Sequence, residues 1–103
     1  MVKTRREINA IIKKYKKSLI TLGIRTEKVI LYGSYAYGRA SEGSDIDLIV
    51  VSSDFGDKDL RERLELLGIA SARILEPIQA QGYTPAELDA KDRSSFIREI
   101  LGA

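Results

Sequence analysis

The chain of 103 residues contains no cysteine and no histidine. The lack of cysteine excludes disulfides, thiol nucleophiles and cysteine-based zinc sites, and the lack of histidine excludes imidazole acid–base chemistry. No apolar run approaches the roughly 18 residues that a membrane-spanning helix needs, and no signal-peptide core is present. We therefore expect a soluble, cytoplasmic protein that makes no membrane contact.

The charge of the chain is nearly balanced, with 17 basic and 15 acidic residues and a net charge of +2. Such a composition does not by itself predict a nucleic-acid binder, so direct nucleic-acid binding stays open. The length predicts a single domain over residues 1–103 with one modest core, too small for the several domains of a templated polymerase. Any larger task requires a partner, and a homo-oligomer is one of the states left open.

Apolar spacing and breaker residues predict an α/β chain in which helices alternate with strands. The expected elements are helices over residues 4–22, 57–72 and 94–101, a short helix after the capping residue Thr84, and strands near residues 29–31, 48–51 and 74–78. The expected buried positions of the first helix are Ile8, Ile11, Ile12, Tyr15, Leu19 and Leu22, and those of the second are Leu60, Leu64, Leu67 and Ala70. The lysines at positions 13, 14, 16 and 17 fit either a solvated face or contact with an acidic partner or RNA.

An apolar run at residues 29–32 ends at Gly33-Ser34. The run has the pattern of a buried strand, and a glycine at its end lets the backbone turn closely past another group. In such a turn, backbone N–H groups and a hydroxyl can contact phosphate oxygens. A glycine followed by a serine is, on its own, usually only a turn.

Two carboxylates, Asp45 and Asp47, stand at the start of a second apolar run over residues 48–51. At about 3.3 Å per residue they lie roughly 7 Å apart on one face of a strand, which suits ligands that converge on one or two cations. Magnesium is the natural cation because it prefers hard oxygen ligands completed by substrate phosphates. Asp-x-Asp alone is often a solvated loop end, but together with Gly33-Ser34 it predicts a nucleoside triphosphate site.

The stretch from Val29 to Val51, VILYGSYAYGRASEGSDIDLIVV, resembles the DNA polymerase beta-like nucleotidyltransferase superfamily. Within it, the stretch is most similar to the minimal nucleotidyltransferases (MNT) that are often found beside HEPN-domain partners. The resemblance implies a small mixed β-sheet with helices packed on it, one of them beginning at Gly-Ser. The predicted nucleotide-binding residues are Gly33, Ser34, Arg39 and Ser44, and the predicted catalytic and metal-binding residues are Asp45 and Asp47. Arg39 has a second interpretation as a solvated loop residue.

The function implied by the resemblance is magnesium-dependent transfer of AMP from ATP, or another nucleoside triphosphate, to a HEPN-type toxin, and so an antitoxin role. Two alternatives stay open. The first is a catalytically impaired module that still binds nucleotide and partner. The second is nucleotidyl transfer to a small-molecule or RNA acceptor.

Active relatives carry a third carboxylate on the strand that follows the second helix, about five residues before a Thr-Pro. In this chain that position is Gln79, five residues before Thr84-Pro85. A neutral amide neither binds magnesium nor accepts a proton as well as a carboxylate does. Glu76 is the alternative, and because the two positions are an odd number of residues apart, only one of them can face the aspartates on a strand.

Overall fold

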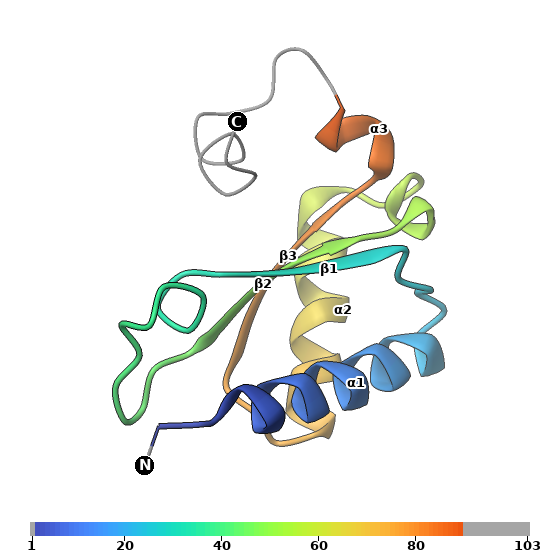
Figure 1. Cartoon of the computed structure of the whole chain (residues 1–103). Coiled ribbons are helices and arrows are strands. Elements are labelled where there is room, and N and C mark those ends of the chain that lie inside the picture. Colours follow the sequence, from blue (N-terminus) through green and yellow to red (C-terminus); the bar gives the residue numbers. More distant parts are fainter. Residues whose placement is uncertain (1, 90–103) are drawn as a thin grey trace.

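The computed structural model describes residues 2–89 (Figure 1). In chain order its elements are α1 (Arg5–Thr21), β1 (Lys28–Tyr32), β2 (Ile46–Val51), the 3-10 helix η1 (Ser53–Phe55), α2 (Leu60–Arg73), β3 (Ile78–Tyr83) and α3 (Pro85–Leu88). The three strands form one sheet in the order β1-β2-β3. β2 pairs antiparallel with β1 and parallel with β3, so the predicted mixed α/β fold is confirmed.

α1 begins and ends where its sequence predicts. The Thr4 side chain caps the first turn and accepts a hydrogen bond from the Glu7 N–H, while the Glu7 carboxylate accepts one from the Thr4 N–H. This reciprocal pair satisfies two N–H groups that the helix start leaves without partners. The chain leaves the helix through Gly23 at φ +85°, a conformation that favours glycine. The buried residues of α1 are Ile8, Ile11, Tyr15, Ser18 and Leu19.

Both long helices cover the same face of the sheet (Figure 1). On β2, the side chains of Ile46, Leu48 and Val50 face α1 and α2 and are fully buried. Because side chains alternate along a strand, Asp47 and its alternate neighbours point to the opposite face. That face carries a smaller apolar cluster, centred on Ile49, at the end of the sheet near α3.

Hydrogen bonds from side chain to backbone join α1 to α2 inside the core. The Tyr15 hydroxyl donates to the Leu67 carbonyl at 2.9 Å, and the Ser18 hydroxyl donates to the Ala70 carbonyl at 3.0 Å. Tyr15 is completely buried, and this burial raises the pKa of its phenol. The two bonds fix the helix pair in one register because each buried hydroxyl needs its acceptor.

The strand expected at residues 74–78 was wrong. α2 continues to Arg73, Leu75 adopts φ +55°, and the strand begins only at Ile78, after Pro77. Pro77 has no N–H to donate, and the left-handed conformation at Leu75 breaks an extended run. The true strand shows a two-residue alternation, Ile-Gln-Ala-Gln, which is the pattern of a strand with one buried face.

The buried face of α2 was also only partly predicted. Leu67 and Ala70 are buried, but Leu60 and Leu64 are 67% and 48% exposed, and Arg63 is buried in their place. The helix expected over residues 94–101 lies outside the described residues. Within residues 2–89, no helix combines the length and the apolar character needed to cross a membrane.

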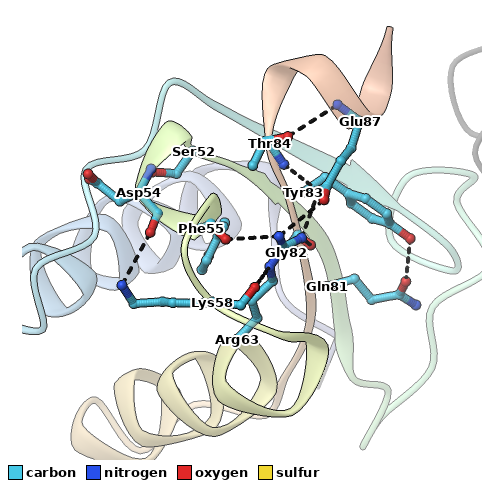
Figure 2. Close-up of polar contacts among 10 residues, drawn as sticks. All are labelled: Ser52, Asp54, Phe55, Lys58, Arg63, Gln81, Gly82, Tyr83, Thr84 and Glu87. Carbon is cyan, nitrogen blue, oxygen red and sulfur yellow. Dashed lines mark hydrogen bonds and ion pairs between the residues drawn. The ribbon is translucent and has the colours of Figure 1, made fainter. Parts of the chain in front are cut away.

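Arg63 connects four segments at the end of the sheet where β3 meets α3 (Figure 2). Its guanidinium donates to the carbonyls of Lys58, Phe55 and Gly82 at 3.0, 2.8 and 3.2 Å. It also forms a bidentate ion pair with Glu87 at 2.6 and 3.1 Å. This pairing lowers the pKa of the Glu87 carboxyl. The arrangement uses the planar, five-donor shape of arginine, which lysine cannot reproduce.

Replacing Arg63 with leucine should destabilise the protein strongly. The substitution leaves three backbone carbonyls without their donor and the half-exposed Glu87 carboxylate without its ion-pair partner. A buried acceptor left without its donor costs about 1–3 kcal/mol. Urea unfolding followed by circular dichroism measures the change. Arg61→Leu is the control, since the Arg61 side chain is 89% exposed and, among residues 2–89, pairs with Glu65 on the helix surface. Equal midpoints for the two variants would contradict the role given to Arg63.

Candidate functional site

Three side chains form a row across the strands on the face of the sheet away from α1 and α2. Asp47 of β2 pairs in register with Tyr32 of β1 on one side and with Gln79 of β3 on the other. Residues paired in this way project to the same face. The central aspartate therefore lies between a phenol and an amide.

Gly33 directly follows Tyr32 and packs against the Asp47 side chain. A Cβ atom built on Gly33 would lie 2.1 Å from Oδ2 of Asp47, closer than atoms can approach, and Gly33 has φ +74°. Both the close contact and the positive φ require glycine at this position. The glycine of the turn and Asp47 are thus in direct contact, although 14 positions separate them in the chain.

The surroundings of Asp47 disfavour the ionised form of its carboxyl. Partial burial, and then the negative charge of Asp45, raise the pKa of the Asp47 carboxyl. A carboxyl whose pKa is higher in the folded state contributes stability at low pH, and this stability is lost as the pH rises through the raised pKa. At neutral pH the ionised pair therefore costs stability, which a bound divalent cation would relieve.

The loop between β1 and β2 holds the remaining predicted residues. Ser34 follows the close contact at Gly33 and its carbonyl accepts a hydrogen bond from the Arg39 N–H at 2.8 Å. The Arg39 side chain is exposed. The Ser44 hydroxyl accepts from the Ser41 N–H at 2.9 Å and closes a small turn just before Asp45.

The helix that the resemblance implied after Gly33-Ser34 is absent from this loop. Residues 34–38 form only a hydrogen-bonded turn, in which the N–H of Tyr37 reaches the Gly33 carbonyl at 3.2 Å. Gly38, at φ +68°, then leaves the right-handed region and stops the turn from extending. Within the turn, Tyr37 is 60% exposed.

No third carboxylate joins Asp45 and Asp47 within residues 2–89, since no group of three acidic side chains there is placed to hold a metal ion. Gln79 occupies the position beside Asp47, and Glu76 lies in the connection that precedes β3. The chain therefore offers a pair of carboxylates and a neutral amide where active relatives are expected to have three acids. Two carboxylates with substrate phosphates and water still suit Mg²⁺, which commonly binds proteins through one or two carboxylates.

Sequence reasoning missed three polar side chains on the face that carries Asp47. The Tyr83 hydroxyl donates to Oε1 of Gln81 at 3.0 Å (Figure 2), and Gln81 also lies within hydrogen-bonding range of the Tyr32 phenol. Burial and the charge of Asp47 raise the pKa of Tyr32, so its phenol stays protonated and can donate. Gln79, Gln81 and Tyr83 are alternate residues, so they share one face of a strand. This shared face can be recognised only when β3 is given its correct bounds.

Comparison with known families identifies the chain. The sequence model of the family described as "Nucleotidyltransferase domain" matches residues 12–100. The chain belongs to this family. The prediction of a nucleotidyltransferase is therefore confirmed at the level of the family.

Two archaeal relatives are similar to this nucleotidyltransferase domain. "Putative protein adenylyltransferase MJ0141" of Methanocaldococcus jannaschii is 39% identical over 66 residues, covering 63% of this chain and 65% of the relative. "Putative protein adenylyltransferase MJ1379" of the same organism is 36% identical over 66 residues, covering 64% and 65%. The chain thus spans just under two thirds of the length of either relative.

A solved structure shows the same fold. The crystal structure of "a putative nucleotidyltransferase from Sulfolobus solfataricus" matches this nucleotidyltransferase domain with a TM-score of 0.54 and 22% sequence identity. The match covers 91% of this chain and 88% of the other. The polymerase beta-like arrangement expected from the sequence is consistent with this neighbour.

Gly33→Ala should abolish magnesium-dependent ATP binding, because the new methyl group cannot coexist with the Asp47 carboxylate. Gly38→Ala is a matched control: Gly38 also has a positive φ, but nothing lies within 4 Å of its Cβ position. Both variants should lose about 1–2 kcal/mol of stability from the left-handed backbone. Only Gly33→Ala should lose binding of a fluorescent ATP analogue, and equal affinities would contradict the contact.

Proposed function

We propose that this nucleotidyltransferase domain uses magnesium to transfer AMP from ATP to a hydroxyl of a partner protein. The observation that carries the proposal is the contact between Gly33 and Asp47, with Asp45 close enough to raise the pKa of Asp47. A turn able to contact phosphate and a pair of carboxylates able to hold a cation thus share one place. The names of the two M. jannaschii relatives, which both read as protein adenylyltransferases, support a protein acceptor.

Each predicted residue has a role in this proposal. Mg²⁺ held by Asp45 and Asp47 would neutralise the charge of the triphosphate. The backbone of Gly33 and the hydroxyl of Ser34 would bind the outer phosphates. Donors that are already in place in the folded protein do not have to reorganise during the reaction. Arg39 and Ser44, on the loop before the aspartates, complete the nucleotide-binding set.

The reaction is a substitution at phosphorus. The acceptor oxygen bonds to the α-phosphorus of ATP, the bond from that phosphorus to the oxygen bridging the β-phosphate breaks, and pyrophosphate leaves. The acceptor proton passes to water, because the amide of Gln79 cannot take it. Positioning and charge neutralisation supply most of the rate in such reactions.

The resemblance of residues 29–51 to the minimal nucleotidyltransferases favours a HEPN-type toxin as the protein acceptor. Modification of the toxin would then be the basis of an antitoxin role. A tyrosine hydroxyl of that toxin is the acceptor group implied by the same resemblance.

Gln79 favours a second candidate function, a module that binds nucleotide and partner but transfers AMP slowly or not at all. Gln79 pairs in register with Asp47, at the site where a carboxylate would strengthen metal binding and accept a proton. General-base assistance of this kind contributes roughly 100- to 10,000-fold to a rate. The two candidate functions predict different rates of AMP transfer but the same binding of nucleotide.

Incubation with labelled ATP, magnesium and the product of the neighbouring gene tests the proposal. Label at the α-phosphate should appear on the partner, and label at the γ-phosphate should not. The Asp45→Asn/Asp47→Asn double variant should lose the transfer yet melt at a higher temperature without metal, since the repulsion between the two carboxylates is gone. Transfer of the γ-label, or transfer by the double variant, would overturn the proposed chemistry.

Gln79→Asp should raise the rate of AMP transfer by roughly tenfold or more, because it adds a carboxylate beside Asp47. The matched control is Gln81→Asp on the same strand and face, which pairs with Ile49 instead of an aspartate. Rates measured at saturating ATP and magnesium separate the variants. An unchanged rate in Gln79→Asp, or an equal gain in Gln81→Asp, would remove Gln79 from the site.

A further inference from the structure

β3 is an edge strand of the described sheet, and its hydrogen bonds to β2 show which of its backbone groups point outward. The N–H of Ile46 donates to the Pro77 carbonyl at 2.8 Å, and the N–H of Ser52 donates to the Tyr83 carbonyl at 2.9 Å. Bonds in a parallel ladder recur every two residues, so odd-numbered residues of β3 bond to β2. The backbone groups of Ile78, Ala80 and Gly82 therefore point outward.

The two ends of this outer edge are already bonded within the chain. The Gly82 carbonyl accepts a hydrogen bond from the Arg63 guanidinium (Figure 2), which confirms that this carbonyl points away from β2. The Ile78 N–H donates to the Glu76 carbonyl at 2.9 Å. Between them, the N–H and C=O of Ala80, the C=O of Ile78 and the N–H of Gly82 have no partner among residues 2–89. Exposed edge groups of this kind are a template for pairing with another strand.

An apolar strip of α2 runs beside the same edge. Leu64, Leu67 and Gly68 of this helix line a groove of about 180 Å³, whose other wall is formed by Ile78, Gln79 and Ala80 of β3. Leu60, one turn before Leu64, is 67% exposed. Beyond its own helix backbone and chain neighbours, no atom of residues 2–89 lies within 4 Å of the Cβ position of Gly68, so this end of the strip is open.

The charges around this strip allow an identical copy to approach. Arg61 and Glu65 flank the strip and form an ion pair with each other at 3.3 Å, so they add no net charge. Gln79 and Gln81 at the strand edge are neutral. α1, in contrast, carries six basic residues and one acidic residue and would repel a second α1.

We propose that β3 pairs antiparallel with β3 of a second copy of this chain, around a twofold axis at Ala80. In this register Ala80 faces the partner's Ala80 and exchanges both backbone hydrogen bonds with it. The Gly82 N–H donates to the carbonyl of the partner's Ile78. Every outward group of β3 that has no partner among residues 2–89 is then bonded.

The side chains of β3 are also compatible with a twofold axis at Ala80. Gln79 lies opposite the partner's Gln81, so two amides can hydrogen-bond across the junction on the face that carries Asp47. Ile78, a branched residue, lies opposite Gly82, which has no side chain. On the helix face, the exposed Leu60 and Leu64 are covered by the second α2, and the two three-stranded sheets become one.

The dimer also extends the candidate site. The row of Tyr32, Asp47 and Gln79 continues into the partner's Gln81, so two sites lie on one face of a continuous sheet. This inference does not depend on the proposed chemistry, because a dimer without transfer activity would support it equally.

Sedimentation velocity of the full chain over a hundredfold range of concentration tests the proposal. The parent should sediment with the mass of two chains. Leu64→Lys should raise the dimer dissociation constant at least tenfold, because it places a charge in the apolar strip. Ile69→Lys is the matched control, since Ile69 is on the same helix and similarly exposed, at 45% against 48% for Leu64, but lies outside the groove.

Ala80→Pro provides a second, independent measurement. It removes the central outward N–H while leaving the ladder to β2 intact, because proline is tolerated at an edge whose N–H faces outward. It should also produce monomers with an unchanged circular dichroism spectrum. A parent with the mass of one chain would overturn the proposal, as would a dimer that survives both Leu64→Lys and Ala80→Pro. Equal dissociation by Ile69→Lys would show that the copies meet elsewhere.

Discussion

The pairing of the buried Arg63 side chain with its acceptors is the interaction on which the end of this sheet depends. One guanidinium on α2 binds η1, the connection from η1 to α2, the end of β3 and the first turn of α3. Buried charge is costly unless every donor is satisfied, so these segments have only one mutual arrangement that keeps the arginine bonded. Arg63 thereby ties the end of β3 at Gly82 to α2 and α3, while the pairing with β2 sets the register that places Gln79 beside Asp47.

The candidate site depends on a second constraint, the absence of a side chain at Gly33. The Asp47 carboxylate fills the space where a Cβ would be, so strand β1, the turn after it and the aspartate of β2 are mutually fitted. The strand before the glycine and the strand after the aspartates are antiparallel neighbours, which brings the two halves of the motif together. Partial burial and the charge of Asp45 raise the pKa of the Asp47 carboxyl, and the proposed cation would stabilise its ionised form.

Local patterns in the sequence determined much of the fold. The sequence predicts the capping residues of α1 and α3, the apolar stripe of α1 and the apolar runs of β1 and β2. These features depend on residues only a few positions apart, so they can be recognised without the tertiary structure. The Gly-Ser and Asp-x-Asp motifs likewise indicated a nucleotidyltransferase, and the family match over residues 12–100 confirms this broader assignment. The residues assigned to nucleotide and metal binding stay predictions.

Only the tertiary structure decided which side chains meet. The sequence predicted Leu60 and Leu64 as buried and gave no sign that Arg63 would be, because burial on α2 is set by where β3 and Glu87 lie, far along the chain. The choice between Gln79 and Glu76 beside Asp47 depended on the starting residue of β3, and a shift of one residue along a strand moves every side chain to the other face. Local propensity carries no information about that register, whereas the parallel pairing of β2 with β3 fixes it.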